Sequence, residues 1–537
     1  MTQVVSPQQE AAVPPRPQRS ARGVGEYTFG AVLAILVLLG LALRFSARSP
    51  LWLDEAQSVA IARLPLSGTG TTLWDGLRQD GSPPLYYLLL HGWIRLFGTS
   101  GHAVRTLSAL LNLACLPPLY LLARRVIGRR QAGVALLLFI TSPFALYFAT
   151  ETRMYDLLLL LSVLGGLAVE RTLRAPGPLP AAGVAVCSGL IALTHYWSLY
   201  LLATLGLGLV LGAVRGRTPL GRRGARWALG GVLAGGVVFA PWLGIFRYQA
   251  VHTGTPWGEP AAFAAVVHAF GEWCGGATTT GRTMLVLVAA LLALAVFGRA
   301  LGPSQVLVDL RGHEPGRILM LLSVGTLIIA VGAGQLVGNA WADRYTATAF
   351  VPFLLVLALG TERLLDRRVL GTALVLLALL GDVSGARAVR KERTQAAEVA
   401  SVLRTQARPG DVVLYCPDQL GPAVAREIEG GRTPAGLRHH SIPTWAPPGR
   451  VDWADYAARN KAADGGALAH RALVEAGATH TVWLVFNGEY RTYEALCPNV
   501  RQALNEQRTV IQVLAAKSPD ESTERDEVYR YAPSTKK

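Results

Sequence analysis

The chain contains repeated apolar stretches, each close to the length that crosses a lipid bilayer as a helix. A helix rises 1.5 Å per residue and the hydrocarbon core is about 30 Å thick, so roughly 20 apolar residues can span it. The first such stretch covers residues 27–45 and no small-residue cleavage signal follows it. We therefore expect an uncleaved membrane anchor at this end of the chain.

Ten further apolar runs follow, which predicts about eleven transmembrane helices in all. They lie at residues 104–123, 131–149, 155–170, 181–195, 197–213, 227–246, 282–300, 318–338, 345–361 and 369–386. With 51% hydrophobic and 16% charged residues over 537 positions, the composition excludes an ordinary soluble protein. We expect a polytopic α-helical membrane protein.

The net charge of +16 does not indicate a nucleic-acid partner, because the basic residues gather in short linkers between the apolar runs. These linkers decide the role of the short apolar run 83–97. If that run lies flat in the membrane interface, all the arginine clusters fall on the cytoplasmic side; if it spans, most fall outside. The clusters are Arg124, Arg125, Arg129 and Arg130; Arg171 and Arg174; Arg215, Arg217, Arg222, Arg223 and Arg226; Arg363, Arg367 and Arg368.

With a flat helix at 83–97, the sequence predicts three parts. Residues 1–22 form a disordered cytoplasmic tail, and residues 23–386 form the membrane domain, with 46–103 as its first extracytoplasmic loop. Residues 387–537 form an extracytoplasmic α/β domain, because the β-like runs 411–416, 481–486 and 509–514 alternate with helix-like stretches such as 396–405. This domain is expected either to act as a structural cap or to bind substrate. Its Cys416 and Cys497 can pair only in an oxidising compartment.

Unusual polar residues collect on the outer side in this topology. Four acids lie there: Asp54 and Glu55 just after the first span, Asp80, and Glu151. Three arginines lie at the same depth: Arg105, Arg153 and Arg344. Sugar transfer to a hydroxyl requires a carboxylate base and cations that stabilise the departing phosphate, and the planar guanidinium fork suits a phosphate well.

Each of these residues also has a plainer interpretation. Asp54 could cap a helix that begins near Ala56, and boundary arginines often reach toward lipid headgroups. His195, followed by Tyr196 and Trp197, is typical of an interfacial aromatic anchor. The convergence of acids and arginines on one side of the membrane favours the catalytic interpretation.

Several motifs resemble those of the GT-C membrane glycosyltransferases, and within them glycosyltransferase family thirty-nine, near the protein O-mannosyltransferases and the aminoarabinose transferases. The matching segments are Trp52-Leu-Asp-Glu55, Ser82-Pro-Pro-Leu-Tyr-Tyr87, the openings and ends of the second span (104–110 and 121–125), Glu151-Thr-Arg-Met-Tyr155 and Asp343-Arg-Tyr345. Gly81-Ser82 departs from the His or Lys that those two subfamilies carry nearby, so mannose and arabinose both stay open.

The resemblance implies a polyprenyl-phosphate sugar donor, inversion at the anomeric carbon and a hydroxyl acceptor on a protein, lipid or glycan. It implies Asp54 as the catalytic base with Glu55 assisting, and Arg105, Arg344 and Arg153 at the donor phosphate. Asp80, Glu151, Tyr155, His195 and Tyr345 are candidate substrate contacts. No nucleotide is required; a divalent cation is compatible with the chemistry, although no ligand spacing demands one.

Two other function classes fit many membrane spans: a transporter or flippase of lipid-linked envelope precursors, and a non-catalytic assembly or sensor protein. Transporters usually carry ionisable or helix-breaking residues at mid-membrane, often in repeated halves. Here the interiors of the spans are mostly Leu, Val, Ala and Gly. The abundance of Arg, Ala and Gly indicates a bacterium, so we expect a multi-pass protein of the cell membrane.

Overall fold

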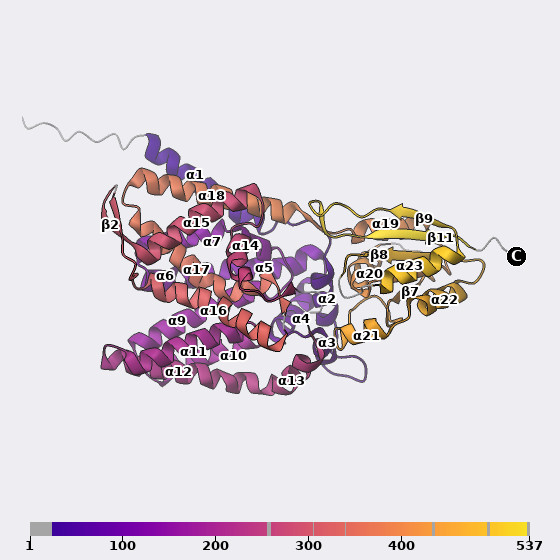
Figure 1. Cartoon of the computed structure of the whole chain (residues 1–537), viewed down its shortest axis with the longest axis horizontal. Coiled ribbons are helices and arrows are strands. Elements are labelled where there is room, and N and C mark those ends of the chain that lie inside the picture. The colour runs from indigo at the N-terminus through magenta and orange to yellow at the C-terminus, as the bar shows by residue number, and fades with distance from the viewer. Residues whose placement is uncertain are drawn as a thin grey trace, which may run out of the picture.

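The computed structural model describes residues 24–254, 259–303, 305–338, 340–431, 435–490 and 495–533. The tail predicted to be disordered, residues 1–22, lies outside these ranges. A helical bundle forms one end of the molecule and a sheet-containing domain forms the other (Figure 1). The predicted fold class, a polytopic helical membrane protein with a C-terminal α/β domain, is confirmed.

Every predicted apolar run contains a helix, as expected for segments whose backbone hydrogen bonds must be satisfied internally in lipid. The bundle helices are α1 (Val24–Leu43), α5 (Gly101–Ala114), α6 (Leu116–Val126), α7 (Arg129–Ile140), α8 (Pro143–Ala149), α9 (Tyr155–Arg174), α10 (Pro178–Ala192), α11 (Ser198–Arg215), α12 (Pro219–Phe239), α15 (Thr279–Phe297), α16 (Gly316–Val337), α17 (Ala347–Gly360) and α18 (Arg367–Arg390). Within the described chain, seven helical segments are long and apolar enough to cross a membrane, and the bent pair α7–α8 would be an eighth. The predicted count of about eleven also includes α1, α9 and α10, which are shorter or more polar.

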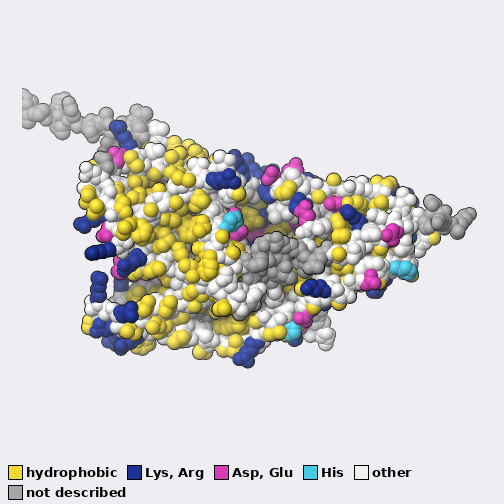
Figure 2. Space-filling view, viewed as in Figure 1, with side chains coloured by type: hydrophobic (Ala, Val, Ile, Leu, Met, Phe, Trp, Pro, Cys, Tyr) yellow, Lys and Arg dark blue, Asp and Glu magenta, His cyan; other side chains and the backbone are white. Residues whose placement is uncertain are grey.

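The arginine clusters gather at the end of the bundle that lies farthest from the sheet-containing domain (Figure 2). The turns after α6, α9, α11 and α17 all lie at this end, together with the start of α1 (Figure 1). A short antiparallel hairpin, β2 (Gly298–Gly302) with β3 (Gln305–Val308), lies there too and was not foreseen. The grouping is the one expected if residues 83–97 do not span.

We call the end of the bundle next to the sheet-containing domain its outer end, and that domain the outer domain. The loop after α1 folds there into three short helices: α2 (Leu53–Ala62), α3 (Leu73–Asp80) and α4 (Leu85–Phe97) (Figure 1). Helix α4 has 13 residues, so it is about 20 Å long and too short to cross 30 Å of hydrocarbon. One of its faces is buried through Tyr86, Tyr87 and Leu90, whereas Leu96 and Phe97 are exposed. This two-faced burial agrees with the predicted interfacial helix.

Helix α17 lies at the centre of the bundle, and all 14 of its residues are buried. A 3-10 turn, η2 (Asp343–Thr346), precedes it at the outer end and carries Arg344 and Tyr345. The outer end also holds α13 (Leu243–His252), α14 (Ala264–Trp273) and the two-residue pairing of β1 (Glu259–Pro260) with β4 (Ala340–Trp341). Arg344 and Tyr345 therefore lie at the outer end of a fully buried helix.

A bend of 56° separates α7 from α8, where Ser142 caps α8 and Pro143 occupies its first turn. The bend exposes carbonyls at the end of α7. The buried side chain of Arg44 satisfies them, because it donates to the carbonyl oxygens of Ile140 at 2.9 Å and Phe139 at 3.3 Å. This arrangement fixes the direction in which α8 leads to the turn at residues 150–154.

The outer domain is a five-stranded mixed sheet in the order β7-β6-β8-β11-β9. Strands β6 (Val412–Cys416), β8 (Val482–Phe486) and β9 (Val510–Leu514) confirm the three predicted strands, and α19 (Ala396–Gln406) confirms the predicted helix. Strand β11 pairs antiparallel with β8 and β9, whereas β6 pairs parallel with β7 and β8. The remaining elements are β5 (Glu392–Thr394), α20 (Gly421–Glu429), β7 (Arg438–Ser441), α21 (Tyr456–Ala462), α22 (Gly465–Ala476), α23 (Leu496–Gln507), β10 (Ser522–Glu524) and β11 (Glu527–Tyr531).

Side chains that alternate along the strands fill two separate cores. Val413 and Tyr415 of β6 belong to the core that is continuous with the bundle and includes α19 and α20. Val412 and Leu414 pack in a second core with α22 and α23. Leu53, the first residue of α2, also packs in this second core, so the outer domain and the first loop share apolar contacts.

A disulfide joins Cys416, at the end of β6, to Cys497 in α23. The two residues are 81 positions apart in sequence. Closing so long a loop restricts the unfolded chain, and this restriction stabilises the folded domain.

We predict that replacing both cysteines by alanine lowers the free energy of unfolding of the outer domain by about 2–4 kcal/mol. Thermal unfolding of the detergent-solubilised protein measures this change, and Cys187→Ala, which removes an unpaired cysteine of α10, is the control. In the native protein a maleimide should label Cys416 and Cys497 only after reduction and unfolding. Labelling without a reductant would contradict the prediction.

Candidate active site

Asp54 lies in the first turn of α2, which begins at Leu53 rather than near Ala56. Its carboxylate does not cap the helix; it faces two arginines from other parts of the bundle. Arg344 places a terminal guanidinium nitrogen (Nη2) 3.4 Å from Asp54 Oδ2, and Arg153 places Nε 4.0 Å from the same oxygen. The side chain of Asp54 keeps 16% of its surface exposed, and the oxygen that faces the two arginines is buried.

Arg153 is held in this position by the first loop. Its Nη1 donates to Ser58 Oγ at 2.9 Å and to the hydroxyl of Tyr87 at 3.3 Å. Tyr87 in turn donates to Asp80 at 2.6 Å, and Gln57 donates to the other oxygen of Asp80 at 3.2 Å. Asp80 therefore orients Tyr87 and, through it, Arg153.

Glu55 points away from Asp54 into a buried cluster of cations. Arg105 forms a two-pronged pair with it, with donor–acceptor distances of 2.8 and 2.5 Å. Arg393 from β5 lies 3.4 Å from Glu55 Oε1, and the backbone N–H of Thr152 donates to that oxygen at 2.9 Å. Burial alone would raise the pKa of Glu55, but Arg105 and Arg393 hold it below its usual value. The carboxylate of Glu55 is therefore charged, and Arg105, Arg393 and the Thr152 N–H compensate that charge.

The remaining bonds of Arg105 and Arg393 go to backbone carbonyls and to one hydroxyl of the protein. Arg105 donates to the carbonyl oxygens of Ser49 at 2.5 Å and Pro50 at 3.1 Å. Arg393 donates to the carbonyl and the hydroxyl of Thr150, at 2.8 and 2.7 Å. Both side chains are almost completely buried.

Glu151 lies on the turn between α8 and α9, next to this cluster. Its Oε1 accepts a hydrogen bond from the indole of Trp52 at 3.0 Å. Burial raises the pKa of Glu151 to about 7, and the nearby carboxylates of Glu55 and Asp54 contribute to the rise. Arg344 also lies over the ring of Trp52, 5.7 Å from its centre, so Trp52 connects Glu151 to the arginine that faces Asp54.

Three aromatic residues line one side of the cluster. The ring of His195 lies 5.9 Å from that of Tyr155 and 4.8 Å from that of Tyr345. His195 is buried; burial and the charges of Arg153 and Arg344 lower its pKa to about 3. Its Nδ1 accepts the backbone N–H of Trp197, so the proton of the neutral ring lies on Nε2.

The structure therefore brings together all ten residues selected from the sequence, from six segments of the chain. It departs from expectation at Arg105, which was expected at the donor phosphate but is engaged by Glu55 and the backbone. Sequence reasoning missed Arg393 and gave no role to Tyr87, Ser58 and Trp52. Tyr87 and Trp52 lie within recognised motifs, whereas Arg393 follows the last span in a charged run that resembles any cytosolic or outer linker.

One group of side chains in the described part of the chain has the spacing of metal ligands. It consists of His268 and Glu272 on α14 and Asp343 on η2, whose ligand atoms lie within 4.8 Å of one another. Trp341 donates to Asp343 at 2.9 Å. All three side chains are partly or largely exposed, and Asp343 directly precedes Arg344.

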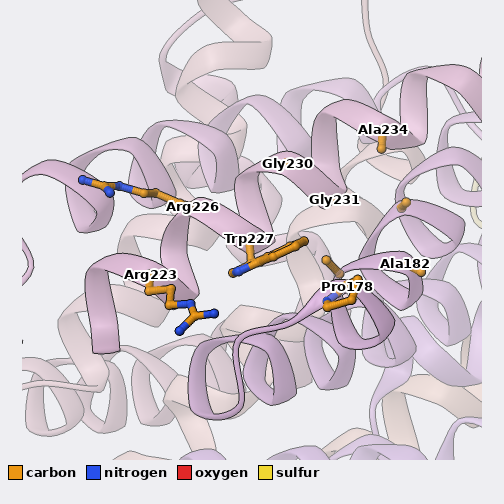
Figure 3. A pocket seen from close by; sticks show the side chains of 10 residues that line it. Pro178, Ala182, Arg223, Arg226, Trp227, Gly230, Gly231 and Ala234 are labelled. Carbon is orange, nitrogen blue, oxygen red and sulfur yellow. The ribbon is translucent and has the colours of Figure 1, made fainter. Parts of the chain in front are cut away.

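Two hollows in the bundle lie away from this cluster. A groove of about 650 Å³ between α10 and α12 is floored by small residues such as Ala181 and Gly231, and Arg223 and Trp227 lie beside it (Figure 3). It lies at the arginine-rich end. A second hollow of about 340 Å³, between α9, α11, α16 and α17, is lined mainly by apolar side chains. Neither is lined by any of the ten site residues.

Comparison with known proteins identifies the fold of the chain. Residues 81–245 match the family model of dolichyl-phosphate-mannose-protein mannosyltransferases. The structure of ArnT from Cupriavidus metallidurans in the apo state superposes with a TM-score of 0.55 at 13% identity, covering 94% of this chain and 98% of that one. The chain has the GT-C fold.

ArnT from the same organism bound to undecaprenyl phosphate gives a TM-score of 0.51 at 14% identity, with the same coverage of both chains. Among curated proteins no sequence matches the chain. The GT-C fold and the mannosyltransferase family match agree with the glycosyltransferase predicted from the motifs around Asp54, Glu151 and Arg344.

We predict that Glu55→Gln lowers the free energy of unfolding by about 3–5 kcal/mol, because it leaves the buried guanidinium groups of Arg105 and Arg393 without their anion. The shift in melting temperature in detergent measures this loss. Arg63→Ala removes the exposed pair of Arg63 with Glu429 and should cost less than about 1 kcal/mol. Equal shifts in the two variants would show that the Glu55 cluster is not a stabilising unit.

Proposed function

We propose that this protein is an integral membrane glycosyltransferase that moves a sugar from a polyprenyl-phosphate donor to an acceptor hydroxyl, with inversion at the anomeric carbon. The observation that carries the proposal is the placement of Asp54 beside Arg344 and Arg153 at the outer end of the bundle. A partly exposed carboxylate can act as a base, and the two cations can stabilise a phosphate that departs with an added negative charge.

The proposed reaction uses Asp54 as the base and the two arginines as the cations that stabilise the leaving phosphate. Asp54 accepts the proton of the acceptor hydroxyl while the oxygen of that hydroxyl bonds to the anomeric carbon. The bond between that carbon and the phosphate oxygen breaks, and the electron pair leaves with the polyprenyl phosphate. Arg344 and Arg153 balance the charge that develops on the phosphate. Attack opposite the leaving group accounts for the inversion.

In this proposal Arg105 and Glu55 do not contact substrate. Their mutual pair fixes the first turn of α2 and thereby the direction of Asp54. Asp80 acts through Tyr87 on Arg153, and Tyr155, His195 and Tyr345 form an aromatic wall against which a sugar ring or a prenyl unit can pack. Glu151 supports Trp52 beside Arg344.

Two features support an extracytoplasmic site. The arginine clusters lie at the opposite end of the bundle, as the positive-inside rule requires for a cytoplasmic end. The disulfide between Cys416 and Cys497 belongs to an oxidising compartment. We therefore propose a multi-pass protein of the cell membrane, with its N-terminus in the cytoplasm and residues 387–537 outside.

The donor class is supported by the undecaprenyl phosphate that one ArnT structure carries on the same fold. The acceptor belongs to the hydroxyl-bearing glycans, lipids or proteins of the cell envelope. A divalent cation at His268, Glu272 and Asp343 would lie one residue from Arg344, and no step above depends on it.

We predict that Asp54→Asn lowers kcat by about 10²–10⁴-fold, because the base that removes the hydroxyl proton is lost. The affinity for polyprenyl phosphate should not fall, because Arg344 and Arg153 stay and lose only a competing anion. Arg344→Ala should weaken that affinity as well as kcat. Transfer from radiolabelled polyprenyl-phosphate mannose and polyprenyl-phosphate arabinose in membranes measures both variants. Asp520→Asn, a change of an exposed acid of the outer domain, is the matched control.

Full activity of Asp54→Asn would refute the assignment of the base. A second arm compares Arg105→Lys with Arg344→Lys: the first should lower thermal stability more than donor affinity, and the second should do the opposite. The reverse result would show that Arg105, rather than Arg344, binds the donor phosphate.

A further inference from the structure

Helix α2 carries Asp54 and Glu55, yet its own sequence supplies no cap for its first turn. The N-cap position is Trp52, whose side chain accepts no hydrogen bond from the helix within the described chain. The first N–H groups of a helix have no partner inside the helix and need one from elsewhere. A catalytic carboxylate in an uncapped first turn would be poorly fixed.

The missing cap comes from the far end of the chain. Glu524, the last residue of β10, accepts the backbone N–H of Leu53 on its Oε2 at 3.3 Å, across 471 positions of sequence. Its side chain is buried, and burial together with the neighbouring Asp526 raises its pKa well above the usual value. Its backbone is fixed as well, because β10 pairs in parallel with β5 and the Glu524 carbonyl accepts from Gln395.

Two more contacts from the outer domain hold α2. The side chain of Leu53 packs in the second core of that domain. One turn later, Gln57 makes a reciprocal pair with the backbone of Val451: it donates to the carbonyl at 2.8 Å and accepts the N–H at 2.9 Å. These groups are all buried. Asp54 thus lies between two residues of α2, Leu53 and Gln57, that are bound by the outer domain.

We propose that Glu524 is a positioning residue for Asp54, and that the outer domain sets the geometry of the catalytic helix through Glu524, Val451 and the core around Leu53. The carboxyl group of Glu524 replaces the N-cap that Trp52 cannot supply, and so fixes the turn that aims Asp54 at Arg344. This inference rests on the proposed function for its kinetic consequence. The cap itself is independent of the reaction.

The experiment compares Glu524→Ala, Glu524→Gln and Thr523→Ala in the full-length protein. Thr523 is the matched control, since it is exposed and lies on the same strand. Glu524→Ala should lower kcat at least tenfold and leave the KM for the donor and the affinity for polyprenyl phosphate within about twofold, because the phosphate-facing arginines stay in place. Glu524→Gln keeps an acceptor oxygen of the same shape and should restore most of the lost kcat.

Hydrogen–deuterium exchange supplies a readout that needs no reaction. Amides in the peptide that covers the start of α2 should exchange at least fivefold faster in Glu524→Ala than in the native protein, whereas Thr523→Ala and Glu524→Gln should match the native protein. Unchanged exchange in Glu524→Ala would overturn the cap. Faster exchange with unchanged kcat would overturn the positioning role.

If no variant and no native sample transfers sugar, the proposed function fails while the exchange data still decide the cap. If Glu524→Ala does not fold, the comparison passes to Gln57→Leu, which removes the bonds to Val451 and also the bond to Asp80. A loss of kcat then supports the proposal only together with faster exchange at the start of α2. Gln57→Leu should then show the same loss of kcat and the same faster exchange. A native kcat in Gln57→Leu would overturn the proposal.

Discussion

The buried charge of Glu55 is the constraint on which the outer end of the molecule depends. A carboxylate removed from water is costly unless cations and hydrogen-bond donors surround it. Here the surrounding groups come from α5, from the turn after α8 and from β5 beyond the last span. Satisfying one ion therefore fixes three distant segments relative to α2.

The neighbouring acids Asp54 and Glu55 show how two identical chemical groups receive different tasks. Glu55 is fully buried and paired with Arg105, whereas Asp54 is partly exposed and faces Arg344. In the proposed mechanism, Arg344 also binds the donor phosphate. Adjacent positions in the first turn of a helix point about 100° apart, so a single turn can direct one carboxylate into the buried cluster and the other toward Arg344 and Arg153. The ion pair of Glu55 with Arg105 holds the first turn of α2 and so keeps Asp54 in place.

The sequence predicted much of this arrangement because the membrane imposes strong patterns. Apolar length identified the helices, and arginine asymmetry placed Asp54, Glu151, His195 and Arg344 at one end. Pairs that depend on three-dimensional proximity leave no pattern in the sequence. Arg105 was expected at the donor phosphate because nothing in the sequence indicates that it pairs with Glu55. Strands β7 and β11, with the polar sequences Arg-His-His-Ser and Glu-Val-Tyr-Arg-Tyr, lack the apolar runs that revealed β6 and β8. Glu524 could not be anticipated, since a cap 471 residues away leaves no local pattern.

The parallel pairing of β5 with β10 has a consequence for biosynthesis. It joins a segment that directly follows the last span to one that is made more than a hundred residues later. Helix α2 is made long before both segments, so it receives Arg393 and Glu524 only after the outer domain has been synthesised and folded. In the proposed topology, the membrane bundle inserts before the first turn of α2 has these partners, and the proposed site is completed only when residues 387–537 have folded.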